Sequence, residues 1–278
     1  MRLRSVLFAP AVRPELIEKL PRAQADAVVI DCEDATPPGS KAAGRANAYE
    51  FGGRLATDGM SVFIRINAVG SPWFADDVRE GVPPGAAGVV LPMVESSDQL
   101  DELASVLARE DRPALAVIAG LETAAGVDQA RTLLAHPVVT AGYFGAEDFI
   151  ADMGGVRTET NTEVLLARSL VAIAGRLAQV PVLDQVVVAY RDDERFRREA
   201  REARSMGYAG KMCIHPAQVA IAHEVFTPSP EEVESARRLI EAHEAAEREG
   251  RSVVVVDGKM IDGPLVAQAK KVIASTEN

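Results

Sequence analysis

The sequence predicts an α/β protein built as a closed (β/α)8 barrel, the TIM barrel. Short runs rich in β-branched residues recur eight times in about the first 220 residues, and segments with helical periodicity separate them. Several of these runs are continuously apolar, as strands covered on both faces are. Eight strands that alternate with helices over this length are typical of the barrel, although the same periodicity also allows a doubly wound open sheet. The expected strands are Ser5–Ala9, Ala27–Asp31, Ser61–Ile66, Gly88–Leu91, Leu115–Leu121, Val138–Phe144, Val182–Val187 and Tyr208–Ile214.

Residues typical of helix ends separate the strands. Pro14 stands where the first turn of a helix is expected. Ser96, followed by Gln99, has the spacing of a capping box before an apolar-periodic stretch. We expect Asn161 to cap the helix that follows it and Gly207 to end the charged helix before it.

The alternation of strands and helices changes beyond residue 225. Pro228 and Pro230 precede an amphipathic helix that ends near Gly250, and a short β-rich stretch and a last helix follow. We therefore expect two parts, a barrel over residues 1–225 and a C-terminal helical extension over residues 226–278.

The composition excludes several classes of function. Of the 278 residues, 41 are Asp or Glu and 30 are Lys or Arg, so the formal net charge is −11 and a broad basic surface for nucleic acid is not expected. The longest apolar runs, such as residues 114–119, are far too short to cross a membrane. Two cysteines, Cys32 and Cys213, lie in apolar strands and cannot form a disulfide framework, so we expect inert core thiols and a cytoplasmic location.

Acidic residues follow several of the predicted strands. In a TIM barrel the C-terminal ends of the strands face the mouth of the active site, so these acids gather at one rim. Clustered carboxylates repel one another, and a divalent cation removes that repulsion. Oxygen donors without a His or Cys cluster favour magnesium or manganese over zinc. The alternative is that the acids cap helices or form ion pairs. The rim acids are Asp31, Glu33, Asp34, Glu95, Glu122, Glu147 and Asp148.

Two basic features stand out against this acidic background. Arg65 ends an apolar strand among the rim acids, where its guanidinium can bind a substrate carboxylate through two hydrogen bonds; the alternative is an internal salt bridge to a rim acid. Residues 1–22 carry more basic than acidic side chains, and Arg13 lies just before a helix N-terminus, a place suited to phosphate. Simple surface charge would explain Arg13 equally well.

With these residues located, the sequence resembles the citrate lyase β-subunit and the stand-alone malyl-CoA, citramalyl-CoA and β-methylmalyl-CoA lyases, in the HpcH/HpaI aldolase superfamily. The resemblance runs through nearly the whole chain in eight ordered motifs. They are RSVLFAPAVRPE (4–15), VVIDCEDATPPGSKAAGR (28–45), FIRIN (63–67), VVLPMVES (89–96), GLETAAGV (120–127), YFGAEDFIADMG (143–154), GYAGKMCIHPAQV (207–219) and GKMIDGP (258–264).

The resemblance implies a magnesium-dependent carbon–carbon lyase, with manganese as a possible substitute. Glu122 and Asp148 would bind the metal, and Glu33 and Asp34 would support its water ligands. Arg65 would bind the substrate acid, with Glu122 also facing the substrate. The products implied are a 2-oxo acid, such as oxaloacetate, pyruvate or glyoxylate, and an acyl thioester of CoA or of a carrier protein.

The resemblance also implies features outside the metal site. Arg13 would lie near the CoA phosphates, and Asp262 would act as acid and base in the site of a neighbouring subunit of a homotrimer. Two positions depart from the family pattern: Ala11 stands where Gly is common, and Met93 stands where Lys is common. Both bear on which substrate is used. The alternative functions are a pyruvate-type aldolase with a free aldehyde acceptor and a non-catalytic partner subunit.

Overall fold

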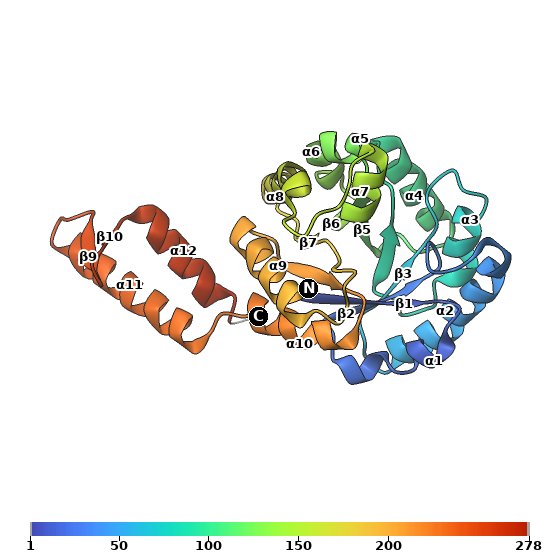
Figure 1. Cartoon of the computed structure of the whole chain (residues 1–278), viewed down its shortest axis with the longest axis horizontal. Coiled ribbons are helices and arrows are strands. Elements are labelled where there is room, and N and C mark those ends of the chain that lie inside the picture. Colours follow the sequence, from blue (N-terminus) through green and yellow to red (C-terminus); the bar gives the residue numbers. More distant parts are fainter. Residues whose placement is uncertain (1, 277–278) are drawn as a thin grey trace. The chain divides into compact units, whose positions relative to one another are not determined.

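The barrel prediction is confirmed by a computed structural model that describes residues 2–276. Eight parallel strands pair in chain order, and β1 also pairs with β8, so the sheet is closed and the open-sheet alternative is wrong. Helices surround the strands on the outside (Figure 1). The strands are β1 (Ser5–Pro10), β2 (Ala27–Asp31), β3 (Val62–Arg65), β4 (Gly88–Leu91), β5 (Ala116–Leu121), β6 (Val139–Phe144), β7 (Val182–Asp184) and β8 (Gly210–Cys213).

Most of the predicted helix ends are also confirmed. Pro14 lies in the first turn of α1, Ser96 forms a capping box with Gln99, and Gly207 ends α9 in the left-handed region with φ 96°. The helices of the barrel are α1 (Pro14–Ile17), α2 (Lys41–Thr57), α3 (Phe74–Asp76), α4 (Ser97–Arg109), α5 (Ala124–Asp128), α6 (Ala130–Leu134), α7 (Ala146–Met153), α8 (Leu165–Ala178), α9 (Asp193–Met206) and α10 (Pro216–Phe226). Single turns of other helix types lie at η1 (Leu20–Ala23), η2 (Pro38–Ser40), η3 (Asp77–Gly81) and η4 (Thr162–Val164).

The predicted helix cap at Asn161 is wrong. Its side chain makes no capping hydrogen bond, and its backbone has φ 55°. The amide oxygen instead accepts hydrogen bonds from Arg157 Nη2 at 3.1 Å and from Gln185 Nε2 at 2.9 Å. Because tertiary partners occupy the side chain, the chain enters α8 through the short turn η4 without this cap.

The inside of the barrel is filled by every second residue of the strands, because side chains alternate between the two faces of a sheet. The buried residues packed there include Val6, Val29, Phe63, Val90, Ile118, Tyr143, Leu183 and Met212. In several strands the next inward-facing residue, two positions later, lies at the C-terminal mouth of the barrel. These residues are Phe8 after Val6, Asp31 after Val29 and Arg65 after Phe63.

Two glycines let neighbouring strands approach closely. A Cβ atom on Gly210 of β8 would lie 1.8 Å from the carbonyl oxygen of Leu3, just before β1. A Cβ atom on Gly88 of β4 would lie 2.1 Å from the carbonyl oxygen of Ala116 in β5. Any larger residue at either position would push the strands apart.

The chain divides into two compact units, the barrel over Leu3–His223 and a C-terminal unit that starts at Glu224. The C-terminal unit contains α11 (Pro230–Arg248), the antiparallel strands β9 (Val254–Val256) and β10 (Lys259–Ile261), and α12 (Gly263–Ala274). Asp257 and Gly258 join the strands with φ values of 49° and 75°, as a tight hairpin turn requires. Within this unit α11 packs against α12.

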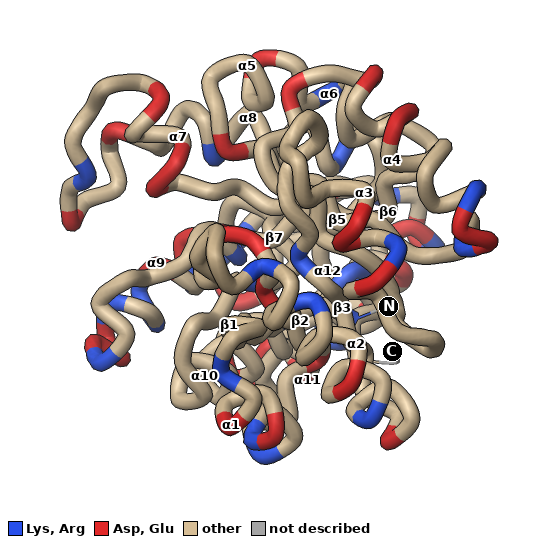
Figure 2. The backbone as a smooth tube through the Cα atoms, turned by 90° about the vertical axis from the view of Figure 1, so that its right-hand side faces the viewer, with Lys and Arg blue, Asp and Glu red and all other residues tan. Residues whose placement is uncertain are grey.

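The surface of the protein carries mixed charge. In Figure 2, Lys and Arg are interspersed with Asp and Glu along the barrel helices.

The two cysteine thiols are internal. Both Cys32 and Cys213 are buried and free, which confirms the expectation of core thiols, and burial raises the pKa of Cys213 to about 12. Of the helices within residues 2–276, none has the length and apolar character needed to cross a bilayer.

Candidate active site

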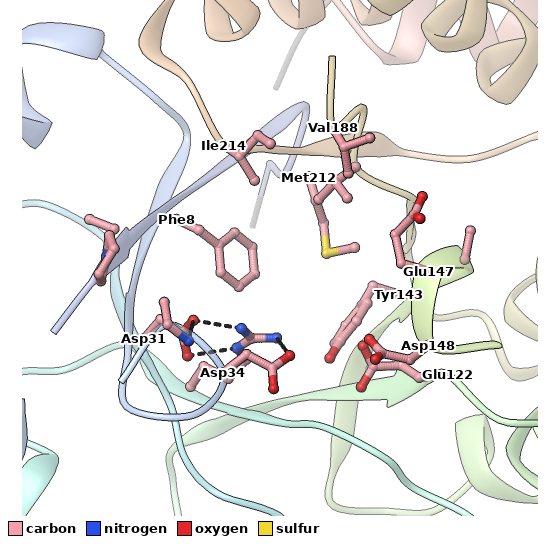
Figure 3. Close-up of a pocket in the computed structure, with 17 residues that line it drawn as sticks. Phe8, Asp31, Asp34, Glu122, Tyr143, Glu147, Asp148, Val188, Met212 and Ile214 are labelled. Atoms are coloured by element: carbon pink, nitrogen blue, oxygen red, sulfur yellow. Dashed lines mark hydrogen bonds and ion pairs between the residues drawn. The ribbon is translucent and has the colours of Figure 1, made fainter. Parts of the chain in front are cut away.

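A cavity of about 480 Å³ lies at the C-terminal mouth of the barrel, and its wall has two chemically different halves. Figure 3 shows Asp31, Asp34, Glu122 and Asp148 on one side and Phe8, Val188, Met212 and Ile214 on the other, with Glu147 near Met212 and Val188. The polar half consists of Asp31, Asp34, Arg65, Glu122, Tyr143 and Asp148, and Glu147 lines the cavity at the edge of the apolar half. The apolar half consists of Phe8, Val186, Val188, Met212 and Ile214, with Ala9 and Pro10 beside them.

Arg65 forms the internal salt bridge that the sequence left open, and its partner is Asp31. The Nε atom lies 2.8 Å from Asp31 Oδ1, and Nη2 lies 2.5 Å from Asp31 Oδ2. The third nitrogen, Nη1, is 3.3 Å from Glu33 Oε2 and 3.8 Å from Asp34 Oδ2. Burial would lower the pKa of Arg65, but the Asp31 carboxylate keeps it well above its ordinary value. The guanidinium is therefore charged and fixed in orientation.

Asp31 is itself held by the backbone of the loop that follows it. Its Oδ1 accepts the N–H of Glu33 at 2.8 Å, and its Oδ2 accepts the N–H of Ala35 at 3.2 Å. The sequence placed Asp31 at the rim without assigning it this role. Its inward position in β2, opposite Arg65 in the register of β2 and β3, is the signal that could have identified the pair.

Glu122 follows β5 and is buried between two backbone segments. Its Oε2 accepts the N–H of Met93 at 3.0 Å, and Met93 adopts φ 54°, a conformation that is strained for a residue with a side chain. On the other side Glu122 lies against Gly145, where a Cβ atom would be only 2.5 Å from Oε1. Burial raises the pKa of Glu122 to about 7, Arg65 opposes that shift and Asp148 adds to it.

Two further acids of the cavity wall, Glu147 and Asp148, lie in the first turn of α7. Burial raises the pKa of Asp148, and the nearby Asp34 carboxylate raises it further. The neighbouring Glu147 forms an ion pair with Arg157 at 3.0 Å, so it is already neutralised. Asp34 is largely exposed to solvent. The remaining uncompensated charge is thus concentrated at Glu122 and Asp148, which lie side by side in Figure 3.

The Tyr143 hydroxyl lies beside these acids. Its Oη faces the Glu122 carboxylate but makes no hydrogen bond of ordinary geometry within the described part of the chain. Tyr143 is fully enclosed, and it fits because Gly120 faces it across β5 and β6, where a Cβ atom would lie 2.4 Å from the hydroxyl. Glu33 Oε2 is also buried, and its partner is Arg65 Nη1 in the ion pair at 3.3 Å. Burial raises the pKa of Glu33 to about 7, while Arg65 opposes that shift. Buried polar groups are normally satisfied, so the Tyr143 hydroxyl indicates a place for a ligand or its water. Tyr143 was not predicted from the sequence.

This half of the wall suits a hard divalent cation. Within residues 2–276 no three His, Cys, Asp or Glu side chains are already arranged as a metal cluster. Mg²⁺, however, retains several waters and needs only one or two protein carboxylates. The oxygen donors Glu122 and Asp148, whose pKa values burial raises, and the Tyr143 hydroxyl beside them fit this requirement.

Lys41 fixes the loop that carries the β2 acids. Its buried Nζ donates hydrogen bonds to the carbonyl oxygen of Cys32 at 2.9 Å and to that of Glu33 at 2.8 Å. A third hydrogen bond reaches Asn67 Oδ1 at 2.7 Å. The loops after β2 and β3 are therefore tied together directly behind Asp31 and Arg65.

Three predicted site residues are not part of the cavity wall: Arg13, Asp262 and Glu33. Arg13 is exposed and forms an ion pair with Glu15, and it does not line the cavity. Asp262 belongs to the C-terminal unit, where its carboxylate caps α12 by accepting the N–H of Leu265 at 3.5 Å. The structure brings together Arg65, Glu122, Asp148 and Asp34, with Glu33 beside Arg65.

The fold and the cavity define a TIM-barrel protein with an acidic, magnesium-type site and one guanidinium at the mouth. Comparison with known proteins agrees with this class. The family model described as HpcH/HpaI aldolase/citrate lyase matches residues 4–216, and the chain belongs to this family. The chain is accordingly an enzyme, a carbon–carbon lyase by family, and magnesium is the metal bound in solved relatives.

Individual relatives match almost end to end. A citrate lyase subunit beta-like protein from Deinococcus radiodurans is 46% identical over 276 residues, covering 98% of this chain and 96% of the relative. A (3S)-malyl-CoA thioesterase from Cereibacter sphaeroides is 32% identical, covering 99% of this chain and 94% of the relative. The solved structure of CitE from Mycobacterium tuberculosis, in complex with magnesium, acetoacetate and coenzyme A, has a TM-score of 0.82 and 30% identity. It covers 99% of this chain and 100% of that one.

Proposed function

We propose that this protein is a magnesium-dependent lyase that cleaves or forms a 3-hydroxyacyl thioester of the citryl-, malyl- or citramalyl-CoA type. The products of cleavage are a 2-oxo acid and an acyl thioester. The observation that carries this proposal is the placement of the Glu122 and Asp148 carboxylates side by side in one cavity with Arg65, where burial raises the pKa of both acids. The CoA and oxo-acid ligands of the solved relative support it.

The metal would be held by Glu122 and Asp148, with Glu33 and Asp34 as acceptors for its water ligands. When bound, it supplies Lewis-acid polarisation of the substrate oxygen. The binding energy of the site depends on the ionised carboxylates, so magnesium binding competes with their protonation. Manganese, which also prefers oxygen ligands, would be an acceptable substitute.

Arg65 would bind the substrate carboxylate. Asp31 occupies Nε and one N–H of Nη2, and Nη1 forms the longer ion pairs with Glu33 and Asp34. A substrate carboxylate would use the second N–H of Nη2 and the N–H groups of Nη1 in place of these longer pairs. Because the loop backbone holds Asp31, the guanidinium stays in place when the substrate is absent. This preorganisation lowers the cost of binding.

The chemical step is a retro-aldol cleavage. The hydroxyl proton leaves, the C–C bond between the carbinol carbon and the thioester α-carbon breaks, and the α-carbon takes up a proton. The family resemblance assigns that proton transfer to Asp262 of a neighbouring subunit in a homotrimer, and phosphate contact with CoA to Arg13. We propose both roles, together with a cytoplasmic location.

Substrate cleavage tests the proposal directly. The purified protein with magnesium is given malyl-, citramalyl- and citryl-CoA, and release of the oxo acid is followed. We expect cleavage of at least one thioester and a loss of at least about 100-fold in activity and metal affinity for Glu122→Gln. The control is Glu102→Gln, which changes an exposed carboxylate of α4. The proposal would be contradicted if no thioester were cleaved and Glu122→Gln left the metal affinity unchanged, and a non-catalytic role would then be favoured. Turnover of free aldehydes alone would favour the pyruvate-type aldolase.

A further inference from the structure

The two halves of the cavity wall differ in the substrate groups that they can bind. Four carboxylates line the polar half: Asp31, Asp34, Glu122 and Asp148. Glu147 also lines the cavity, but Arg157 neutralises it. Arg65 is the one cationic side chain among the described residues of the wall, and it already pairs with Asp31. Even with a divalent cation bound, the wall retains net negative charge. A substrate carboxylate beyond the one that Arg65 can bind would therefore face like charges.

The opposite half of the cavity cannot accept a second carboxylate either. Phe8, Val186, Val188, Met212 and Ile214 offer no hydrogen-bond donor from their side chains. A charged group buried against apolar atoms without a partner is unfavourable, whereas a methyl or methylene group there is favourable.

We infer that the 2-oxo acid used by this enzyme carries a single carboxylate and a small apolar substituent, as pyruvate does, rather than a second carboxylate, as oxaloacetate does. The carboxylate lies at Arg65, and the substituent faces Phe8 and Met212. This inference rests on the proposed function, and it narrows the substrate class of that site.

A matched pair of acids tests the inference, because pyruvate and oxaloacetate differ only in the second carboxylate. In the condensation direction the acetyl thioester loses one methyl proton, a C–C bond forms to C2 of the oxo acid, and the C2 oxygen gains a proton. We expect kcat/KM for pyruvate to exceed that for oxaloacetate by at least about 10-fold. We also expect 2-oxobutyrate, with one more methylene, to react within about 10-fold of pyruvate. Products are identified by mass, because oxaloacetate loses CO₂ to give pyruvate.

A substitution in the apolar half tests which wall faces the substituent. Val188→Lys places a cation at an exposed residue of the cavity wall, and we expect it to shift the ratio by about 10-fold toward oxaloacetate. The control is Val156→Lys, the same change at a residue that is 78% exposed and does not line the cavity. An unchanged ratio in Val188→Lys, or equal or better use of oxaloacetate by the unmodified enzyme, would overturn the inference.

Failure of the substrate inference and failure of the proposed function give different experimental results. If oxaloacetate is condensed preferentially, the inference fails and the proposed function stands. If no acid is condensed, the proposed function fails, and calorimetric binding of pyruvate and oxaloacetate to the magnesium-loaded protein still decides the inference. Tighter binding of pyruvate supports it, and equal or tighter binding of oxaloacetate refutes it.

Discussion

Gly145→Ala should weaken magnesium binding through a single methyl group. The built Cβ atom would lie 2.5 Å from Glu122 Oε1, 2.6 Å from its Cγ and 3.0 Å from its Cδ. An ordinary contact needs about 3.5 Å, so the carboxylate must move by about 1 Å. The hydrogen bond from Met93 opposes this movement. The backbone of Gly145, with φ −100°, accepts alanine without strain of its own, so the effect falls on Glu122.

Displacing a positioned group by about 1 Å costs about 100-fold, which corresponds to ~2.7 kcal/mol. We therefore expect magnesium affinity, measured by titration calorimetry, to fall about 100-fold. The matched control is Gly39→Ala, where a Cβ atom meets nothing within 4 Å. Urea unfolding of both variants monitors the overpacking cost of about 1–3 kcal/mol. A folded Gly145→Ala protein with unchanged magnesium affinity would refute the assignment of Glu122 as a ligand.

Two further predictions concern the supports of the barrel. Lys41→Met leaves the carbonyl oxygens of Cys32 and Glu33 without their hydrogen-bond donor. We therefore expect the free energy of unfolding, measured with urea, to fall by about 3 kcal/mol and lyase turnover to fall with it. Unchanged stability and activity would contradict this. Burial raises the pKa of Asp26, but three hydrogen bonds from Arg4 outweigh it and lower that pKa below its ordinary value. The ionised carboxylate therefore stabilises the fold above about pH 4, and this stabilisation is lost as the pH falls through the folded-state pKa. Asp26→Asn should therefore cost about 2 kcal/mol at pH 7 and progressively less as the pH falls from about 4 through the folded-state pKa. A cost that does not change with pH in urea unfolding would exclude this explanation.

The barrel was predictable because its strands are covered on both faces and therefore have a continuous apolar sequence. The runs beginning at Ala27 and Gly88 match β2 and β4 at both ends. The run that was predicted to end at Val187 instead leaves the ladder after Asp184, because Gln185 turns to contact Asn161. Boundaries thus depended on tertiary partners that lie far away in the sequence.

The candidate site was predictable only in part. Glu122 and Asp148 were placed at the rim because acids at strand ends converge in any such barrel, and the family resemblance selected them from the seven rim acids as metal ligands. The pairing of Arg65 with Asp31 could not be selected over a substrate contact, because both uses need the same guanidinium at the same place. Tyr143 looked like an ordinary core aromatic, and only the structure shows its hydroxyl beside Glu122.

The pairing of β1 with β8 sets a lower limit on how quickly this chain can complete its fold during synthesis. Ser5 of β1 is in register with Lys211 of β8, so one hydrogen-bonding edge of β1 stays unpaired until residues 206 positions later have been synthesised. At ordinary translation rates of about 5–20 residues per second, that interval is roughly 10–40 s. Throughout it, the open hydrogen-bonding edge of β1 is exposed to pairing with other chains. The ring that shapes the cavity therefore cannot close until β8 has been synthesised, and the nascent chain carries this open edge until then.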